Sequence, residues 1–401
     1  MLTNTIRVLL ADDSAVTRRL LSEAMASETE LEVVGMARHG SEALQLLPIT
    51  RPDVVLLDVE MPIMDGVETV TAIRKQDANI PIIMFSSITT AGGGATLDAI
   101  TAGANDYATK PVKLGHANEA LAYIRNELVP KIRMWGRKQH SRFSKPLTSL
   151  TRGSDVGSDS QAGLNSAGKS LAGKSSFPGL PPSAVPRPLK PAVGSSIEPV
   201  DLVAIGVSTG GPNALFEIFG AMPADFPVPI LIVQHMPPVF TGLLAARLDS
   251  VCRLKVREAV NNTVIQPGEV WIAPGDFHMR VKRQRTDLIL ELNQSPPENS
   301  CRPAVDPLFR SVAEVFGARC LGVILTGMGR DGEEGSRAIH KAGGQIIAQD
   351  EASCVVWGMP RAVTQAGLVN AVVPLAQMAS EINDRTRRGS IHRMATMALN
   401  R

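Results

Sequence analysis

The amino-acid sequence predicts an α/β protein with two folded domains and a flexible linker between them. Short apolar runs alternate with segments of helical periodicity in both halves of the chain. This alternation is typical of a parallel sheet that is covered by helices on both faces. The segment between the two halves is rich in serine, glycine and proline. The length of 401 residues fits two domains of ordinary size plus such a linker.

In the N-terminal domain, expected at residues 1–130, the pattern predicts a doubly wound (βα)5 arrangement. Its expected strands are the apolar runs at residues 6–11, 31–36, 54–58, 80–85 and 107–109. Segments of helical period follow the first four runs, as at residues 15–26 and 40–47. Strands that alternate with helices in this way run parallel, so their carboxyl ends share one edge of the sheet.

The linker is expected at residues 131–197. Within residues 141–195, 26 of 55 residues are Ser, Gly or Pro, and none is Glu. A segment of this composition buries too little apolar surface to offset the entropy lost on ordering.

The C-terminal domain is expected at residues 198–384 as a second doubly wound α/β unit with a mainly parallel sheet. Its expected strands lie at residues 202–207, 228–233, 270–273, 288–292, 321–325 and 345–348. Helical patterns fall between many of them, as at 213–220 and 331–342. Residues 385–401 hold five Arg and no acid, and we expect them to form a mobile basic tail.

Charge and composition exclude several classes of protein. The net charge of +2 combines −6 over residues 1–125, +8 over 126–195, −5 over 196–384 and +5 over 385–401. A near-neutral total gives no support for a nucleic-acid binder. No apolar run approaches the roughly 20 residues that span a bilayer, and residues 1–7 lack a signal-peptide pattern. The four cysteines form no C-x-x-C pair. We therefore expect a cytoplasmic protein with no direct membrane insertion and no nucleic-acid partner.

Five polar residues follow expected strands of the N-terminal domain. Asp12 and Asp13 come after the first strand, Asp58 closes the third, Ser86 closes the fourth and Lys110 follows the fifth. A parallel sheet brings them to one edge. Helix capping by Asp12 and Asp13 is the alternative, but it leaves the other three positions unexplained.

The chemistry of this cluster indicates phosphoryl transfer. Three carboxylates in one pocket repel one another, and a hard cation such as Mg²⁺ relieves the repulsion. An aspartate beside Mg²⁺ and an ammonium group is placed to attack a phosphoryl group. Asp58 would then carry the phosphate, with Ser86 and Lys110 binding its oxygens.

A candidate nucleophile stands in the C-terminal domain. Residues 201–212 read DLVAIGVSTGGP, in which Ser208 lies on a glycine-rich turn between a strand and a helix. Such a turn exposes a serine, and the helix N-terminus offers N–H groups to an oxyanion. A dinucleotide fingerprint fails because Ser208 stands at its second glycine. A passive turn remains the alternative.

The base and the acid come from two more strand ends. His235 follows the strand PILIVQ, and Asp331 follows the strand and glycine turn in GVILTGMGRDG. Three strand ends thus bring a hydroxyl, a general base and an orienting acid to one edge. His278, which follows WIAPGDF, is an alternative base or a pocket residue. The chain order Ser–His–Asp disfavours the α/β-hydrolase superfamily.

Both halves resemble known families. The segments LLADDSAVTRRLL, LLDVEMPIMDGVE, IMFSSIT and AGANDYATKP resemble a bacterial two-component receiver domain over about 120 residues. That resemblance implies phosphorylation of Asp58 by a histidine kinase. It also implies Mg²⁺ bound by Asp13, Asp58 and the backbone carbonyl of Glu60, with Ser86 and Tyr107 coupling phosphorylation to a surface shift.

The second half is similar to the catalytic domain of the CheB family of protein-glutamate methylesterases. The segments AIGVSTGGP, IVQHMPPVFT, WIAPGDFHM, CRPAVDPLF, GVILTGMGRDGEEG and AQDEASCVVWGMP carry this resemblance over about residues 200–382. It implies Ser208 as nucleophile, His235 as base and Asp331 as orienter. Backbone N–H groups near Thr209 and Met328 would form the oxyanion hole. Two departures are Val239, where the family commonly has glycine, and Arg330, where asparagine is more usual.

The resemblance implies a phosphorylation-activated enzyme of chemotaxis that hydrolyses glutamate methyl esters on methyl-accepting chemoreceptors and deamidates receptor glutamines. The esterase step needs no cofactor. We expect the unphosphorylated receiver to cover the Ser208 cleft. One rival is a regulator whose second domain only binds a protein, and another is an esterase or peptidase with an unrelated substrate. A DNA-binding output is disfavoured because this half is strand-rich and too long for a helix-turn-helix domain.

Overall fold

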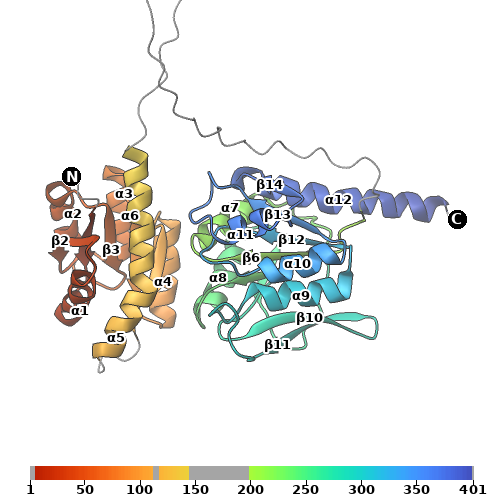
Figure 1. The fold of residues 1–401 in the computed structure, drawn as a ribbon, viewed down its shortest axis with the longest axis horizontal. Coiled ribbons are helices and arrows are strands. Elements are labelled where there is room, and N and C mark those ends of the chain that lie inside the picture. Colours follow the sequence, from red (N-terminus) through yellow and green to blue (C-terminus); the bar gives the residue numbers. More distant parts are fainter. Residues whose placement is uncertain (1–4, 112–116, 144–197, 400–401) are drawn as a thin grey trace, which may run out of the picture. The chain divides into compact units, whose positions relative to one another are not determined.

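The computed structural model describes residues 5–111, 117–143 and 198–399 (Figure 1). Its N-terminal domain has a five-stranded sheet of order β2-β1-β3-β4-β5 in which all neighbours are parallel. The predicted doubly wound fold is therefore confirmed. The strands are β1 (Ile6–Ala11), β2 (Leu31–Ala37), β3 (Val54–Asp58), β4 (Ile82–Ser86) and β5 (Asp106–Thr109). The helices are α1 (Ala15–Ala26), α2 (Gly40–Thr50), α3 (Gly66–Gln76), α4 (Thr90–Thr101), α5 (Ala117–Tyr123), the π-helical turn η1 (Ile124–Leu128) and α6 (Val129–Phe143).

Alternate residues of each central strand pack into cores on opposite faces of this sheet. In β1, Val8 and Leu10 join the core beneath α1, η1 and α6, whereas Leu9 and Ala11 join the core beneath α2, α3 and α4. Because both faces are covered, the central strands are mostly apolar, and every residue of β3 and of β4 is buried. Side-chain caps fix where helices begin, as where Ser14 accepts the amide of Thr17 and where Asp65 and Glu68 form a capping box.

Helix α6 corrects the predicted start of the linker. Residues 131–143 were expected to be flexible, but they belong to this helix. Ile132 and Trp135 are buried in the receiver core, and Lys131 Nζ pairs with Asp106 Oδ1 at 2.9 Å. The close passage of Gly136 over Ile6 leaves no room for a Cβ atom. The rest of the expected linker, up to residue 197, lies outside the described residues.

The C-terminal domain has a seven-stranded parallel sheet of order β14-β13-β12-β6-β7-β9-β8 and a separate antiparallel hairpin, β10–β11. The strands are β6 (Leu202–Val207), β7 (Ile230–Gln234), β8 (Lys255–Glu258), β9 (Glu269–Ile272), β10 (His278–Gln284), β11 (Asp287–Asn293), β12 (Cys320–Ile324), β13 (Gln345–Gln349) and β14 (Ala371–Val373). The helices are α7 (Gly211–Ala221), α8 (Phe240–Val251), α9 (Val305–Phe316), α10 (Glu333–Lys341), α11 (Met359–Gln365) and α12 (Leu375–Leu399).

Helices cover both faces of this second sheet as well (Figure 1). In β6, Leu202 and Ala204 face the core that contains α9, α10 and α11, whereas Val203 and Ile205 face the core of α7, α8 and α12. The sequence missed the short edge strands β8 and β14 because neither is a long apolar run.

The predicted mobile tail is corrected in part. Helix α12 continues from residue 375 to residue 399, across the expected boundary at 384. Arg385 pairs with Glu381 and donates to Gln345 Oε1 at 2.6 Å, so the first turn of the expected tail is anchored to β13. Among the residues that the structure describes, no helix combines the length and the apolar character that a membrane span requires.

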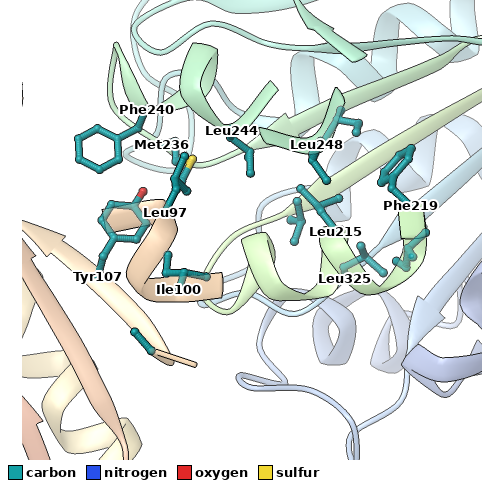
Figure 2. Close-up of a cluster of buried hydrophobic side chains, with 14 of the residues drawn as sticks. Leu97, Ile100, Tyr107, Leu215, Phe219, Met236, Phe240, Leu244, Leu248 and Leu325 are labelled. Atoms are coloured by element: carbon teal, nitrogen blue, oxygen red, sulfur yellow. The ribbon is translucent and has the colours of Figure 1, made fainter. Parts of the chain in front are cut away.

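The N-terminal and C-terminal domains touch through α4, β5 and α8. The rings of Tyr107 and Phe240 stack with centroids 5.3 Å apart and an interplanar angle of 11°. Figure 2 shows this pair beside Leu97, Ile100 and Met236 in one cluster of buried side chains. Arg247 pairs with Asp98 at 3.2 Å at the margin of the contact. Tyr107, on the outermost strand β5, therefore links the N-terminal sheet to the second domain.

Candidate functional site

The acidic cluster of the receiver forms as predicted at the carboxyl edge of its sheet. Carboxylate oxygens of Asp12, Asp13 and Asp58 lie within 4.8 Å of one another. Lys110 Nζ lies 2.6 Å from Asp58 Oδ2 and 2.9 Å from Asp12 Oδ2. Oxygen donors at this spacing suit a hard divalent cation such as Mg²⁺.

The surroundings of this cluster disfavour the charged forms of its buried carboxylates. Burial, together with the neighbouring Asp12 carboxylate, raises the pKa of Asp58 to about 6. Burial also raises the pKa of Asp12, although its pairing with Lys110 opposes this. Burial would lower the pKa of Lys110, but the two carboxylates outweigh that effect and raise it. One ammonium group therefore does not compensate the buried carboxylates fully.

Three more predicted receiver residues take separate positions. Ser86 lies at the end of β4, but its hydroxyl donates to the Gly92 carbonyl at 3.0 Å and makes no described bond to Asp58. Tyr107 is buried at the contact with Phe240. Glu60, expected to offer its backbone carbonyl, is exposed just after β3. Lys110 and Asp58 thus meet here, whereas Ser86 and Tyr107 contact other groups.

The turn that carries Ser208 is built from glycines that other residues could not replace. Gly210 has a φ of +76°, and a Cβ atom there would meet Val355. A Cβ on Gly211 would lie 1.9 Å from Gln234 Oε1, and one on Gly327 would lie 2.8 Å from the Ser208 Cβ. The Ser208 amide donates to the Thr326 carbonyl at 3.0 Å, which ties β6 to the end of β12. The motif STGG thus fixes Ser208 at the sheet edge.

His235 and Asp331 meet as the sequence predicts. His235 Nε2 lies 2.7 Å from Asp331 Oδ2, and the His235 amide donates to the Val207 carbonyl next to Ser208. Since Nε2 is paired with the acid, Nδ1 is the ring nitrogen that faces away from Asp331, and Cys301 Sγ lies 3.6 Å from it. The three residues therefore share one edge of the sheet, although 123 positions separate the first from the last.

Asp331 is held by more than His235. Its two oxygens accept the amides of Val305 at 2.6 Å, Gly332 at 2.9 Å and Asp306 at 3.2 Å. Asn299 Nδ2 donates to the same carboxylate at 2.9 Å. Three backbone amides, one side-chain amide and one imidazole converge on this carboxylate, so its orientation is fixed.

The pair shifts both pKa values. Burial would raise the pKa of Asp331, but the bonds from His235 and the backbone amides outweigh burial and lower it. Burial would lower the pKa of His235, but the bond to Asp331 outweighs it and raises the pKa above its usual value. Asp331 is thus the fixed anion, and the imidazole is the group that gains or loses a proton.

A cavity of about 500 Å³ opens beside Ser208. Thr209, Met328 and Cys301 line it, as do Ser208 and His235. Thr209 is buried, whereas 42% of Met328 is exposed. The two residues expected at the oxyanion hole therefore border the space beside the serine.

His278 has a different role from the one expected. It opens β10 rather than closing β9, because the chain turns at Asp276, where φ is +68°. Its Nδ1 accepts the Ala304 amide at 3.2 Å, and its Nε2 donates to the Pro296 carbonyl at 3.1 Å. His278 is buried and does not line the cavity, so it is neither base nor pocket residue; it holds the loop before α9 in place.

The sequence missed four polar neighbours of this site. Gln234 Nε2 donates to the carbonyls of Ser208 and His235. Cys301 Sγ lies 3.6 Å from His235 Nδ1. Asp306 is a second buried carboxylate, and Asn299 Nδ2 lies 2.9 Å from its Oδ2. Two of these neighbours, Cys301 and Asp306, lie in the segment CRPAVD, whose thiol and carboxylate are the features of the sequence that could have indicated them.

The fold and the two edges define a receiver domain joined to an α/β domain with a serine, a histidine and an aspartate at its sheet edge. Family models match both halves: "Response regulator receiver domain" over residues 8–122 and "CheB methylesterase" over residues 203–382.

Relatives match along almost the whole chain. A protein-glutamate methylesterase/protein-glutamine glutaminase of Trichodesmium erythraeum is 45% identical over 94% of this chain and 97% of its own length. Another from a Nocardioides species is 42% identical over 96% of each. The solved CheB methylesterase catalytic domain of Thermotoga maritima is 43% identical and covers 46% of this chain and 98% of its own, with a TM-score of 0.46. The chain belongs to the family of CheB-type protein-glutamate methylesterases/protein-glutamine glutaminases.

Proposed function

We propose that the chain is a phosphorylation-regulated serine hydrolase that demethylates glutamate methyl esters on chemoreceptors and deamidates selected receptor glutamines. The observation that carries the proposal is the 2.7 Å bond between His235 Nε2 and Asp331 Oδ2 at the sheet edge that holds Ser208. Membership of the family supports the same activity. Ser208 is the nucleophile, His235 the general base and Asp331 the residue that orients the base.

The reaction follows from this geometry. His235 Nδ1 takes the proton from Ser208 Oγ as the oxygen attacks the side-chain carbonyl. The tetrahedral intermediate collapses to a glutamyl ester of Ser208, and methanol leaves, or ammonia from a glutamine, after accepting the proton from His235. Water then attacks the acyl-enzyme, with His235 again as base, and releases glutamate. Backbone N–H groups near Thr209 and Met328 stabilise the oxyanion.

In the receiver, Asp58 accepts a phosphoryl group from a histidine kinase. Asp13, Asp58 and the backbone carbonyl of Glu60 would hold Mg²⁺, which supplies the charge neutralisation that phosphoryl transfer requires. The raised pKa of Asp58 supports this assignment, since it marks a site with too few positive charges. Lys110 binds the phosphate oxygens, and Ser86 does so after its hydroxyl leaves Gly92. A cytoplasmic location is part of this proposal, since the kinase and the receptor segments would have to reach the protein there.

The proposed regulation depends on the receiver residues that line the cavity beside Ser208. Tyr107, Tyr123 and Lys131 of the receiver border the same space as Ser208. In the unphosphorylated chain the receiver therefore restricts receptor access, and phosphorylation of Asp58 shifts the population toward open forms. Tyr107 supports this route because it stacks on Phe240 and lies on β5, the strand that leads to Lys110 of the acidic cluster.

Methanol release from methylated receptor membranes tests the proposal. The wild type should release methanol, more with a phosphodonor, and Ser208→Ala should release essentially none. Ser250→Ala, at an exposed hydroxyl at the end of α8, is the matched control and should behave as the wild type. Absence of methanol release from the wild type and from Ser208→Ala alike would favour a binding regulator, and turnover of other esters alone would favour an unrelated substrate. Methanol release by Ser208→Ala equal to that of the wild type would contradict the role of Ser208.

A further inference from the structure

A second cavity, of about 880 Å³, lies beside the one that holds Ser208. Met328 and Gly329 line both cavities, so a single loop separates them. All residues around the second cavity belong to the C-terminal domain. Neither the reaction nor its regulation, as derived above, uses this space.

The second cavity is positively charged. Arg330, Arg337 and Arg361 line it, against one acid, Glu333. Glu333 is buried and binds two of the three arginines: Arg330 Nη2 at 2.9 Å and Arg337 Nη2 at 3.1 Å. Arg337 also lies 3.5 Å from Glu334. Arg361 is exposed, and within the described ranges no carboxylate pairs with it.

The wall between the cavities is rigid. The Gly327 amide donates to the Val356 carbonyl, and the amides of Gly358 and Met359 donate back to the Gly327 carbonyl at 3.1 and 2.9 Å. A Cβ on Gly358 would lie 2.6 Å from the Gly327 oxygen, so the backbones of the loops that contain Gly327 and Gly358 are in direct contact. Arg361, in the first turn of α11, therefore stands in a fixed position relative to Met328.

A further donor in this cavity lacks a partner. The indole Nε1 of Trp357 is shielded from solvent, and no described group accepts a hydrogen bond from it. Trp357 lines the same cavity as Arg361. Because this Nε1 is shielded, the guanidinium of Arg361 is the group of the cavity best placed to bind a carboxylate, which accepts its N–H donors.

We propose that this cavity binds a carboxylate of the receptor segment whose ester lies at Ser208, and so determines which glutamates are hydrolysed. The inference rests on the proposed function. Side chains three or four positions apart on a helix are neighbours, one turn of about 5.4 Å from each other. With an ester in the first cavity, the side chain one turn away reaches across Met328 into the second. Each completed hydrolysis creates a carboxylate, so a segment already processed at one site is bound better at the next.

Two helical peptides test the inference with the full-length, phosphodonor-activated protein. Both carry one γ-methyl glutamate, and they differ only in a Glu or a Gln one turn away. For the wild type, kcat/KM should be about fivefold higher on the Glu peptide, because a partly exposed ion pair contributes modestly. Arg361→Gln should bring the ratio of the two values close to one. Arg283→Gln, at an exposed arginine of β10 outside both cavities, should keep the wild-type ratio.

The outcomes separate the inference from the function on which it rests. Equal kcat/KM values of the wild type on the two peptides would overturn the carboxylate site and leave the esterase intact. An unchanged ratio in Arg361→Gln would also overturn it. A ratio that falls toward one as salt is added would support it, because exposed charges are screened. Absence of methanol from both peptides and from methylated receptor membranes would overturn the proposed function, and the inference with it.

Discussion

The two sites place an aspartate at equivalent edges of two parallel sheets, with opposite electrostatic results. Asp331 accepts three backbone amides and an imidazole, and its pKa is lowered. Asp58 accepts one backbone amide and faces Asp12, and its pKa is raised to about 6. The folded chain itself thus stabilises the charged form of Asp331, whereas it disfavours the charged form of Asp58.

The largest expected effect comes from removing the negative charge of Asp331. Asp331→Asn should lower kcat for methanol release by about 10³-fold or more, because the imidazole loses the anion that orients it and stabilises its charge. Asp287→Asn, at an exposed aspartate opening β11, is the control. A thermal melt should show that both variants fold. A kcat near that of the wild type would contradict the role of Asp331.

Changes at the acidic cluster around Asp58 should act differently, since this cluster regulates the rate of methanol release and performs no ester chemistry. Asp58→Asn should abolish the increase in methanol release caused by a phosphodonor while basal release persists. Removing divalent cations with a chelator should do the same to the wild type, because the acidic cluster then lacks its counter-charge. Loss of basal release on chelation would show instead that the ester step depends on the metal.

Two neighbouring glycines of α4 test how the sites communicate. A Cβ on Gly93 would lie 2.7 Å from Leu243 Cδ1 in α8, whereas a Cβ on Gly94 would meet nothing within 4 Å. Gly93→Leu should therefore separate the domains and raise basal methanol release several-fold. Gly94→Leu places the same side chain on the same helix and should leave basal release unchanged. Equal rates in the two variants would contradict autoinhibition through this contact.

The smallest expected effect concerns the second buried acid of the esterase site. Burial, together with the nearby charge of Asp331, raises the pKa of Asp306 to about 6. The hydrogen bond from the Gly335 amide opposes this shift only in part. Above that pH, ionised Asp306 favours protonated His235. Asp306→Asn should then lower the His235 pKa, and the acid limb of the kcat/KM profile should move down by a few tenths of a pH unit. Asn299→Asp adds a carboxylate and should move the limb upward.

Sequence reasoning found the residues that a simple topological rule controls. Asp58, His235 and Asp331 all close or follow apolar strands, and parallel strands bring such positions together. This rule did not predict the site residues that lie on loops. Asn299 reaches Asp331 from a loop where its own φ is +51°, and Cys301 meets His235 from the same loop. No strand pattern describes the path of such a loop.

Two errors had specific physical causes. His278 follows an apolar run, but the turn at Asp276 makes it the first residue of a new strand instead of the last of an old one. Residues 131–143 of α6 were assigned to the linker because the alternation of strands and helices was followed only to about residue 130, although Val129, Ile132 and Trp135 recur at helical spacing and are buried. The catalytic roles of Ser208, His235 and Asp331 and the phosphorylation of Asp58 stay predictions.

The way Asp331 is bound also constrains how this chain can evolve. Its carboxylate accepts amides from the first turn of α9 and from Gly332, the residue just before α10. A substitution there removes the acceptor of two amides at the start of α9 and of the Gly332 amide, as well as a partner from the base. The hydroxyl of Ser208 makes no hydrogen bond to any described residue. A descendant that abandoned catalysis but kept its fold would therefore lose Ser208 long before it lost Asp331.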